Sequence, residues 1–490
     1  MIHKADVCIV GAGIAGLNAL FVASRYLSPE QKIVLIDRRA RVGGMWVDTY
    51  PYVRLHQPHP MFTAGNIRWT LDKEPSYLAT KGEVLDHFTH CVDVIKQRVQ
   101  VEELFGWEFE SAEESDGIVR VTCRSADGEV RLVEAERLIK AYGLGVTPND
   151  PLELSSSRVQ SVSPDYCDVR SGEMRASNAP VWIIGGGKTA MDTAHTLITE
   201  YPGREVHMVA GRGTFFANRD RMFPTGARRW YSGALLATVA EQMGLRFDGT
   251  NETQVQDWFR STYGTFVTPS ADNYLIGVLS EAENKTISAG LHDVVMDYFV
   301  DVVDRKDATE MVFRSGATKQ IEPGSWIVNC TGYLGLADAP PYEPYVSHGG
   351  AVVSIHPRSA TLHLPAFMGY YLTHLLFLDK LRHVPLYEVD LFDLRQKSNV
   401  VFPYVLFALV QHNLSLIYDN VPRRVFSANG LDFDKWYPLP RRLPSMVKFM
   451  LTHRRTQEQA RQVLDTVRER FDIRCGPLSE SPVREPSPSS

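Results

Sequence analysis

Gly11-Ala12-Gly13-Ile14-Ala15-Gly16 is the stretch of sequence that decides the fold. An apolar run at residues 7–10 leads into it, and a helix-compatible segment follows to Leu27. A second apolar run at 33–36 then ends at Asp37. This order predicts strand, tight turn, helix and strand, with a carboxylate about 20 residues beyond the glycines. Such a unit places the helix N-terminus against the phosphates of a dinucleotide.

A second unit repeats the pattern and changes its last residue. Residues 181–184 are the strand, Gly185-Gly186-Gly187-Lys188-Thr189-Ala190 opens a helix to 199, and the next strand, 206–209, runs into Arg212. A carboxylate at this place accepts from a ribose 2′-OH, whereas a guanidinium pairs with a 2′-phosphate. The first unit therefore suits FAD and the second NADPH.

The residues expected to bind the cofactors follow from these two patterns. For FAD they are Gly11, Gly13, Ile14, Ala15, Gly16, Asp37 and Arg38, and for NADPH they are Gly185, Gly187, Lys188, Thr189, Ala190 and Arg212. Alternatives stay open: Lys188 and Thr189 as a solvated first turn, and Arg212 as a surface arginine. Arg219 and Arg221 are further candidates for the phosphate pocket that spacing does not decide.

We expect an α/β protein with two Rossmann-like dinucleotide-binding domains and a helical C-terminal region. Residues 326–333 repeat the style of 138–143 and are expected to return the chain to the first sheet. The tail is rich in Pro and Ser, a composition typical of disorder. The expected boundaries are 1–160 and 329–400 for the two parts of the FAD-binding domain, 170–328 for the NADPH-binding domain with a helical insertion, 401–475 for the helical region and 476–490 for the disordered tail.

Composition narrows the class of protein. A net charge of −6 and scattered arginine pairs argue against a nucleic-acid partner. The six cysteines form no Cys-x-x-Cys pair and have no metal-type spacing, so we expect neither a metal site nor a redox-active disulfide. The N-terminus enters the first strand directly, which leaves no room for a signal peptide and favours a cytoplasmic protein. Nothing in the sequence predicts the oligomeric state.

Residues 365–425 are unusually apolar, above all 400–418. That run is about as long as a bilayer is thick. It is interrupted by Pro403, Gln411, His412 and Asn413. We favour helices that wall a lipophilic pocket or the core. A peripheral membrane contact through this C-terminal region and a spanning helix are the alternatives.

Four further motifs are similar to those of the class B flavin-dependent monooxygenases, which include flavin-containing, N-hydroxylating and Baeyer–Villiger enzymes. They are Gly43-Gly44-Met45-Trp46, the Tyr-Pro-Tyr-Val-Arg run at 50–54, Ala141-Tyr142-Gly143 through Pro148, and Leu364-Pro365-Ala366-Phe367-Met368-Gly369. The resemblance spans residues 5–375. It fails at 159–166, where Ser161 or Val162 stands in place of the family's histidine, so the chain resembles a divergent member.

The resemblance implies an oxidoreductase in which NADPH reduces FAD, O₂ is activated as a C4a-(hydro)peroxyflavin, and one oxygen passes to a small lipophilic substrate. It places His56 and Arg54 at the reacting centre, and a histidine pKa near neutrality suits proton relay. The alternative for His56 is a histidine that only supports the structure of a loop, and the alternative for Arg54 is a structural salt bridge. The resemblance also places further residues near the flavin: Gly44, Met45, Trp46, His56, Gly143 and Gly369.

Two other functions stay open. The missing linker histidine is compatible with an FAD-dependent NAD(P)H oxidase or reductase that does not retain an oxygenating intermediate. A nucleotide-sensing flavoprotein without turnover is the other alternative.

Overall fold

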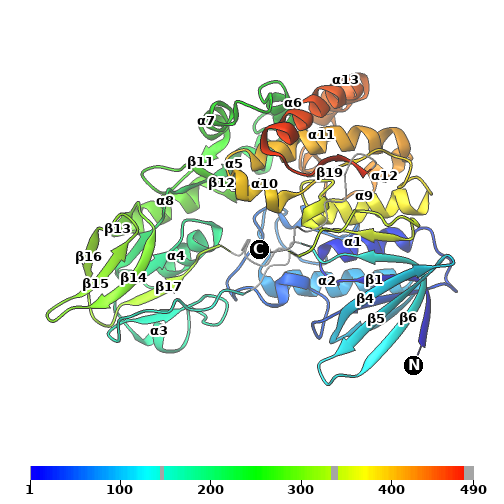
Figure 1. The fold of residues 1–490 in the computed structure, drawn as a ribbon. Helices are drawn as coiled ribbons and strands as arrows, with labels where there is room; N and C mark the ends of the chain where they lie inside the picture. The colour runs from blue at the N-terminus through cyan, green and yellow to red at the C-terminus, as the bar shows by residue number, and fades with distance from the viewer. Residues whose placement is uncertain (1, 144–147, 333–339, 479–490) are drawn as a thin grey trace.

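The computed structural model describes residues 2–143, 148–332 and 340–478 of the 490-residue chain. A mixed sheet and a parallel sheet form separate lobes, and the C-terminal helices lie in the upper part of the molecule (Figure 1). The expected α/β class with two Rossmann-like units is confirmed. The middle of the Ala141–Pro148 motif, Tyr333 and residues 479–490 lie outside the described residues.

The first sheet combines a parallel half with an antiparallel one. β6 pairs with β1 along its length, whereas its other edge is shared: residues 130–135 pair with β5 and residues 138–140 with β18. A strand from more than 200 residues later thus completes this edge. In sheet order the strands are β3 (Gln100–Phe105), β2 (Lys32–Asp37), β1 (Ile2–Val10), β6 (Val130–Lys140), β5 (Ile118–Ser125) and β4 (Trp107–Ser115), with β18 (Val352–Ser354) beside β6.

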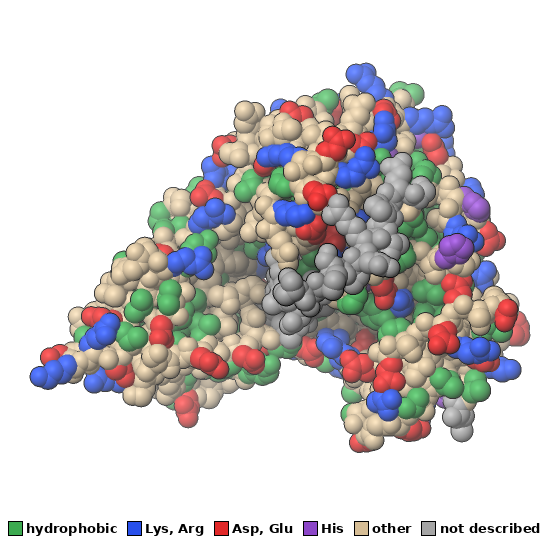
Figure 2. Space-filling model, in the orientation of Figure 1, with side chains coloured by type: hydrophobic (Ala, Val, Ile, Leu, Met, Phe, Trp, Pro, Cys, Tyr) green, Lys and Arg blue, Asp and Glu red, His purple; other side chains and the backbone are tan. Residues whose placement is uncertain are grey.

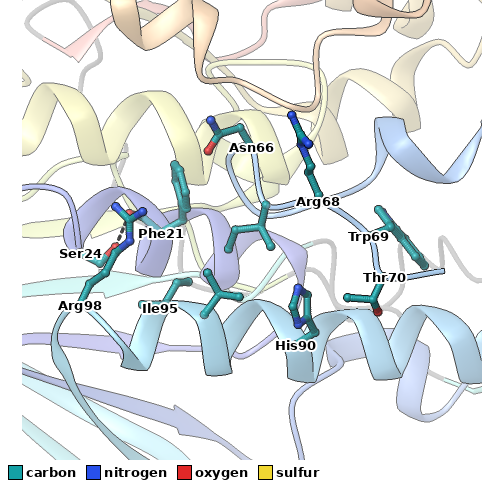
Figure 3. A pocket seen from close by; sticks show the side chains of 11 residues that line it. Phe21, Ser24, Asn66, Arg68, Trp69, Thr70, His90, Ile95 and Arg98 are labelled. Atoms are coloured by element: carbon teal, nitrogen blue, oxygen red, sulfur yellow. Dashed lines mark hydrogen bonds between the residues drawn. The ribbon is translucent and has the colours of Figure 1, made fainter. Parts of the chain in front are cut away.

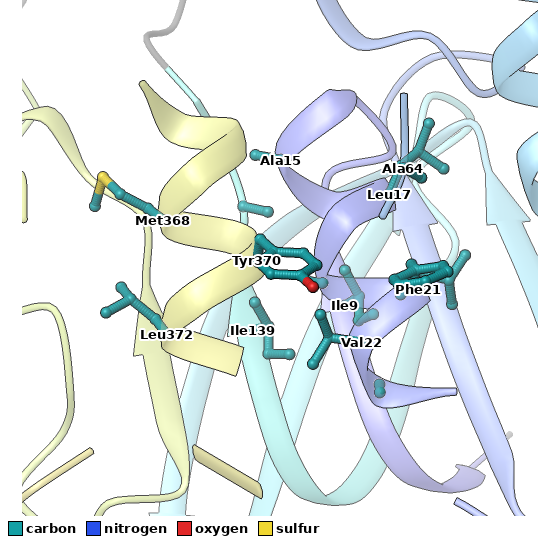
Figure 4. Packing of buried hydrophobic residues seen from close by; sticks show 14 of the residues in the cluster. Ile9, Ala15, Leu17, Phe21, Val22, Ala64, Ile139, Met368, Tyr370 and Leu372 are labelled. Carbon is teal, nitrogen blue, oxygen red and sulfur yellow. The ribbon is translucent and has the colours of Figure 1, made fainter. Parts of the chain in front are cut away.

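Helices α1 (Ile14–Ala23) and α9 (Pro365–Phe377) pack tightly on this sheet. The ring of Tyr370 points from α9 toward α1 and is fully buried above Ile139 (Figure 4). The two helices approach closely at Gly369, where a Cβ atom would lie 2.2 Å from the carbonyl oxygen of Ala15. α2 (Lys81–Lys96) contacts α1.

The second sheet is parallel throughout. α4 (Lys188–Glu200) and α8 (Glu281–Gly290) lie together beside it, and an antiparallel sheet of β14 (Phe299–Asp304), β15 (Thr309–Phe313) and β16 (Thr318–Ile321) accompanies it. In order its strands are β13 (Asp293–Val295), β9 (Val206–Val209), β8 (Val181–Ile184), β17 (Trp326–Asn329) and β7 (Gln160–Val162).

One expectation about the connection between the sheets is wrong. β17 does not return the chain to the first sheet, because it pairs with β8 and β7 in the second one. The return comes at β18. Each sheet contains a buried apolar strand that is followed by a glycine, β6 in the first sheet and β17 in the second. The local pattern therefore does not identify the sheet to which such a strand belongs.

The helical insertion of the second unit and the C-terminal region pack together in a third, mainly helical layer. Its members are β10 (Thr214–Asn218), α5 (Arg219–Met222), α6 (Leu236–Gly244), α7 (Glu252–Tyr263), β11 (Gly264–Thr265), β12 (Asn273–Leu279), α10 (Leu391–Lys397), α11 (Phe402–Asn420), α12 (Arg423–Ser427) and α13 (Leu439–Phe471). α11 is largely buried against α13, α6 and α9. Among the residues that the structure describes, no helix is long and apolar enough to cross a membrane.

The predicted disordered tail starts within an ordered strand. β20 (Cys475–Pro477) pairs antiparallel with β19 (Tyr387–Val389), so residues 476 and 477 are part of the fold. Backbone hydrogen bonds to β19 order these residues despite their composition.

Replacing Gly369 by Val should destabilise the protein. The added carbons would overlap the Ala15 carbonyl, and overpacking of this kind costs about 1–3 kcal/mol. The matched control is Gly82→Ala in α2, where a Cβ meets nothing within 4 Å, and where the substitution should stabilise by about 0.5–1 kcal/mol. Thermal unfolding followed by circular dichroism measures both. Equal melting temperatures for Gly369→Val and wild type would contradict the close packing.

Candidate functional site

The first glycine loop connects β1 to α1 beside the carboxyl end of β2. Gly11 donates its N–H to the carbonyl of Ile36 (2.7 Å). The buried Asp37 accepts from the N–H groups of Ala12 (2.7 Å) and Arg39 (2.9 Å). A carboxylate has about four acceptor positions, so capacity remains for a ribose hydroxyl. Arg38, the next expected ligand, is exposed.

The Gly43–Trp46 turn lies directly against this loop. A Cβ atom on Gly44 would lie 2.7 Å from the Cα of Gly13, so only two glycines allow these backbones to meet. Met45 is 43% exposed, and the partly buried Trp46 packs on Phe62, with 5.8 Å between ring centroids.

Two later expected ligands also lie at this end of the sheet. The end of β6 reaches the loop through the N–H of Ala141, which donates to Val10 (2.7 Å), and Gly143 forms the turn that follows. Gly369 of α9 meets Ala15 on α1. The structure therefore assembles the expected FAD ligands around the N-terminus of α1.

The second glycine loop has the same relation to its sheet. Gly185 donates to the carbonyl of Val209 (2.9 Å) at the end of β9. A Cβ atom added to Gly187, the residue before α4, would meet nothing within 4 Å. Thr189 is half-buried in the first turn and Ala190 is buried behind it. The exposed Arg212 follows β9 by three residues, held by one hydrogen bond to Asn273 (3.4 Å).

Both loop helices begin without a side-chain cap. Gly13 and Gly187 occupy the N-cap positions of α1 and α4, and neither helix has an acidic residue in its first turn. α2 and α8, in contrast, carry complete capping boxes. The first N–H groups of a helix need a partner, and a diphosphate supplies one. The residues present at both loops therefore fit dinucleotides.

The segment 50–58 joins the two units. Tyr50 donates to Asp192 (2.8 Å), and the hydroxyls of Tyr52 and Thr193 are hydrogen-bonded at 2.8 Å. Both partners belong to α4. The loop that follows the first glycine turn thus rests on the helix that opens the second.

A partly buried ion pair anchors the far end of this segment. Arg219 of α5 donates to the backbone carbonyl of His56 (2.7 Å) and to Glu283 of α8 (2.7 Å). Burial alone would raise the pKa of Glu283, but the charges of Lys188 and Arg219 hold it at about 2. Glu283 therefore stays ionised at neutral pH and keeps Arg219 in place.

His56 lies at the centre of these groups with its pKa lowered to about 4. Burial of the ring is the main cause, and the charges of Lys188 and Arg219 add to it. The expectation of a pKa near neutrality is therefore wrong, because the sequence reveals neither the burial of the ring nor the charges that surround it. At neutral pH the imidazole is uncharged and offers one donor and one acceptor.

Two expected site residues have other partners in the structure. Arg54 is exposed and donates to the Tyr77 hydroxyl (3.3 Å) and the Leu78 carbonyl (3.1 Å). Lys188 forms an ion pair with Asp192 one turn along α4. The structure thus brings Lys188, and not Arg54, into the group around His56.

Asp192, Arg219 and Glu283 are site residues that the motifs do not identify. Arg219 was a candidate for a phosphate pocket, yet it is buried against Glu283. Glu283 also completes the capping box of α8 with Ser280, which is the one signal that its sequence context carries. Arg221 instead donates to the carbonyl of Thr262.

An apolar cluster lies next to this charged group. Met61, from the 3₁₀ helix η2 (His59–Met61), packs against residues that flank α5 and against the C-terminal region. Tyr437 donates to the carbonyl of Met222 in α5 (2.9 Å). All three parts of the chain therefore meet here, and the cluster comprises Met61, Phe223, Leu235, Trp436 and Tyr437.

A separate cavity of about 330 Å³ opens elsewhere on the first unit (Figure 3). Phe21 and Ser24, at the C-terminal end of α1, line it with Arg68, His90 and Arg98. Phe21 lies about 10 Å along the helix axis from Ile14. The cavity therefore opens at the end of α1 opposite to the glycine loop.

Comparisons with known proteins agree with the two-nucleotide pattern. The family model described as pyridine nucleotide-disulphide oxidoreductase matches residues 5–258. A Mycobacterium tuberculosis protein, named as the FAD-containing monooxygenase MymA, is 26% identical over 212 residues, which are 41% of each chain. The match thus spans about two fifths of that relative's length.

Two enzymes are among the solved structures to which the chain is similar. The open form of cyclohexanone monooxygenase is 13% identical, with a TM-score of 0.49 over 88% of this chain and 96% of that one. The bacillithiol disulfide reductase of Staphylococcus aureus is 12% identical, with a TM-score of 0.46 over 77% of this chain and 98% of that one.

The lowered pKa of His56 predicts a pH dependence of stability. The unfolded residue takes up a proton near pH 6.5 and the folded one only near pH 4, so stability falls as pH is lowered through this window. The contribution is on the order of 2–3 kcal/mol. In His56→Gln this contribution disappears, and thermal unfolding between pH 7 and 4 should show a shallower decline than in wild type. Parallel curves would contradict the assignment.

Proposed function

The chain belongs to the pyridine nucleotide-disulphide oxidoreductase family, and we propose that within it the protein is an FAD-containing, NADPH-dependent monooxygenase. It transfers one oxygen atom from O₂ to a small lipophilic molecule, at nitrogen, sulfur or carbon or into a carbon–carbon bond beside a carbonyl. The name of the mycobacterial relative supports the oxygenase activity.

The contact between segment 50–58 and α4 is the observation that carries this proposal. Tyr50 and Tyr52 hold the loop beside the FAD site against the helix that would bind the NADPH diphosphate. Hydride transfer requires the nicotinamide and flavin rings to stack closely. The contact between this segment and α4 supports such an arrangement.

The chain's own residues bind and orient the cofactors and exclude water from the site. The uncapped N-termini of α1 and α4 bind the diphosphates, Asp37 accepts from a ribose hydroxyl, and Arg212 pairs with a 2′-phosphate. Bound FAD supplies the electron transfer and the activation of O₂. The neutral His56 donates one hydrogen bond and accepts another at the reacting centre, without adding a charge.

The cysteines argue against a disulfide reductase within this family. All six are free thiols, and none forms a Cys-x-x-Cys pair. Burial raises the pKa of Cys91 to about 11, which disfavours a reactive thiolate. Free thiols also suit the reducing cytoplasm, where we place the enzyme.

The apolar cluster supports a lipophilic substrate. Met61, Phe223 and Trp436 come from three different parts of the chain and lie beside the segment that carries His56. Through Trp436 the C-terminal region packs next to this segment. An apolar wall excludes water and favours apolar ligands.

An NADPH oxidase is the second candidate. Ser161 and Val162 lie in β7, at the edge of the second sheet, where the family's histidine is missing. Loss of that residue would favour release of the reduced oxygen as peroxide before a substrate reacts.

Anaerobic reduction followed by oxygen separates these activities. NADPH should bleach the flavin absorbance, and admission of O₂ should then give a transient absorbing species before the oxidised spectrum returns. Immediate reoxidation with one equivalent of hydrogen peroxide would establish the oxidase instead. Failure of NADPH and NADH to bleach bound flavin would refute both enzymes.

Replacing Arg212 by Ala should impair use of NADPH selectively. Loss of a charge-assisted contact to the 2′-phosphate costs about 1.5–3 kcal/mol, so KM for NADPH should rise roughly 10- to 100-fold while KM for NADH changes little. The control is Arg305→Ala, on an exposed turn after β14. If Arg212→Ala impairs both coenzymes equally, the 2′-phosphate assignment is wrong.

A further inference from the structure

The first half of α13 has an apolar face that the rest of the fold leaves exposed. Leu451 is 80% exposed and stands on the same side of the helix as five other apolar residues. They recur at spacings of three and four, the pattern of one helix face. The stripe consists of Leu439, Leu443, Met446, Val447, Met450 and Leu451.

Two exposed aromatic residues lie near the start of α13. Trp230 ends the 3₁₀ helix η3 (Gly226–Trp230) and Tyr231 follows it, and they are 61% and 75% exposed. Arg441 of α13 donates to the carbonyls of Arg229 (3.0 Å) and Gly233 (2.6 Å). The loop that carries the aromatic pair is therefore hydrogen-bonded to the first turn of α13. We call the stripe with Trp230 and Tyr231 the α13 face.

The charge around the α13 face is strongly positive. Residues 439–457 contain five Lys or Arg and no Asp or Glu, in a chain whose net charge is −6. α12 adds the exposed Arg423, which contacts the sulfur of Met450 (3.3 Å), and the exposed Arg424. Glu241 and Asp419 pair with Lys448 and Arg454, so the balance stays basic. Lys and Arg side chains are visible along the upper edge of the molecule, where α13 lies (Figure 2).

We propose that the α13 face binds the surface of an anionic lipid bilayer. α13 lies parallel to the membrane, with the Leu and Met stripe among the headgroups and the basic residues beside lipid phosphates. Tryptophan and tyrosine prefer this interface because their rings are amphipathic. A second copy of the chain would bring two basic faces together, which opposes self-association.

This site differs from the membrane contact that the sequence suggests. Residues 400–418 are more apolar, yet α11 buries most of them against α13, α6 and α9. The less apolar α13 is amphipathic, basic and exposed. These are the properties of an interfacial helix.

Vesicle sedimentation tests the proposal on the full-length protein. Wild type should pellet with vesicles that contain phosphatidylglycerol and stay in solution with pure phosphatidylcholine, and added salt should weaken the binding. Leu451→Glu and Arg455→Glu should each reduce the bound fraction about fivefold to tenfold. The control is Val300→Glu in β14, a site that is 55% exposed and outside the α13 face. Far-ultraviolet circular dichroism shows whether each variant is folded.

Three results would overturn the proposal. They are absence of binding to anionic vesicles, equal binding by Leu451→Glu and wild type, and a dimer in light scattering that Leu451→Glu dissociates in the absence of lipid binding. The last result would assign the face to a second copy. All of these measurements are independent of flavin, coenzyme and turnover.

Discussion

Close backbone contact around the N-terminus of α1 is the constraint on which the first unit depends. Gly44 touches Gly13, and Gly369 touches Ala15, so segments from three distant parts of the sequence reach the same helix end. Any side chain at the contact would hold the segments apart. A diphosphate needs the N–H groups of α1 to remain accessible, and the glycines meet that need by packing backbone against backbone on one side only.

Charge organises the boundary between the two units. The pair of Arg219 and Glu283 is partly buried, and each member also has further hydrogen bonds that offset the cost of removing its charge from water. Arg219 donates one of these hydrogen bonds to the His56 carbonyl, so the position of the histidine depends on a residue of the other unit. Burial of the ring keeps the imidazole neutral, and the charges of Lys188 and Arg219 add to this effect. Arg219 therefore contributes to both the position and the protonation state of His56.

Local patterns predicted both nucleotide units, because each strand, glycine turn and helix is contiguous in sequence. Strand β9 has the bounds expected for it. The prediction that β17 joins the first sheet was wrong, because the pairing between strands is not determined by local sequence. The role of Arg219 and the pKa of His56 were also beyond the sequence, because both depend on Glu283 and Lys188, which lie far from them along the chain. The roles proposed for His56, Arg54 and Arg212 stay predictions.

The split edge of β6 has a consequence for synthesis of the chain. The ribosome releases β1 to β6 first, but β18 and α9, which finish that sheet and cover it, follow more than 200 residues later. The strands of the second sheet are contiguous from β7 to β17, so all of them are synthesised before β18. The nascent first sheet therefore exposes an unpaired strand edge and an uncovered apolar face for the time needed to make the second. Fast closure of the inserted unit would shorten that interval and bring residues 352–377 back to their partner.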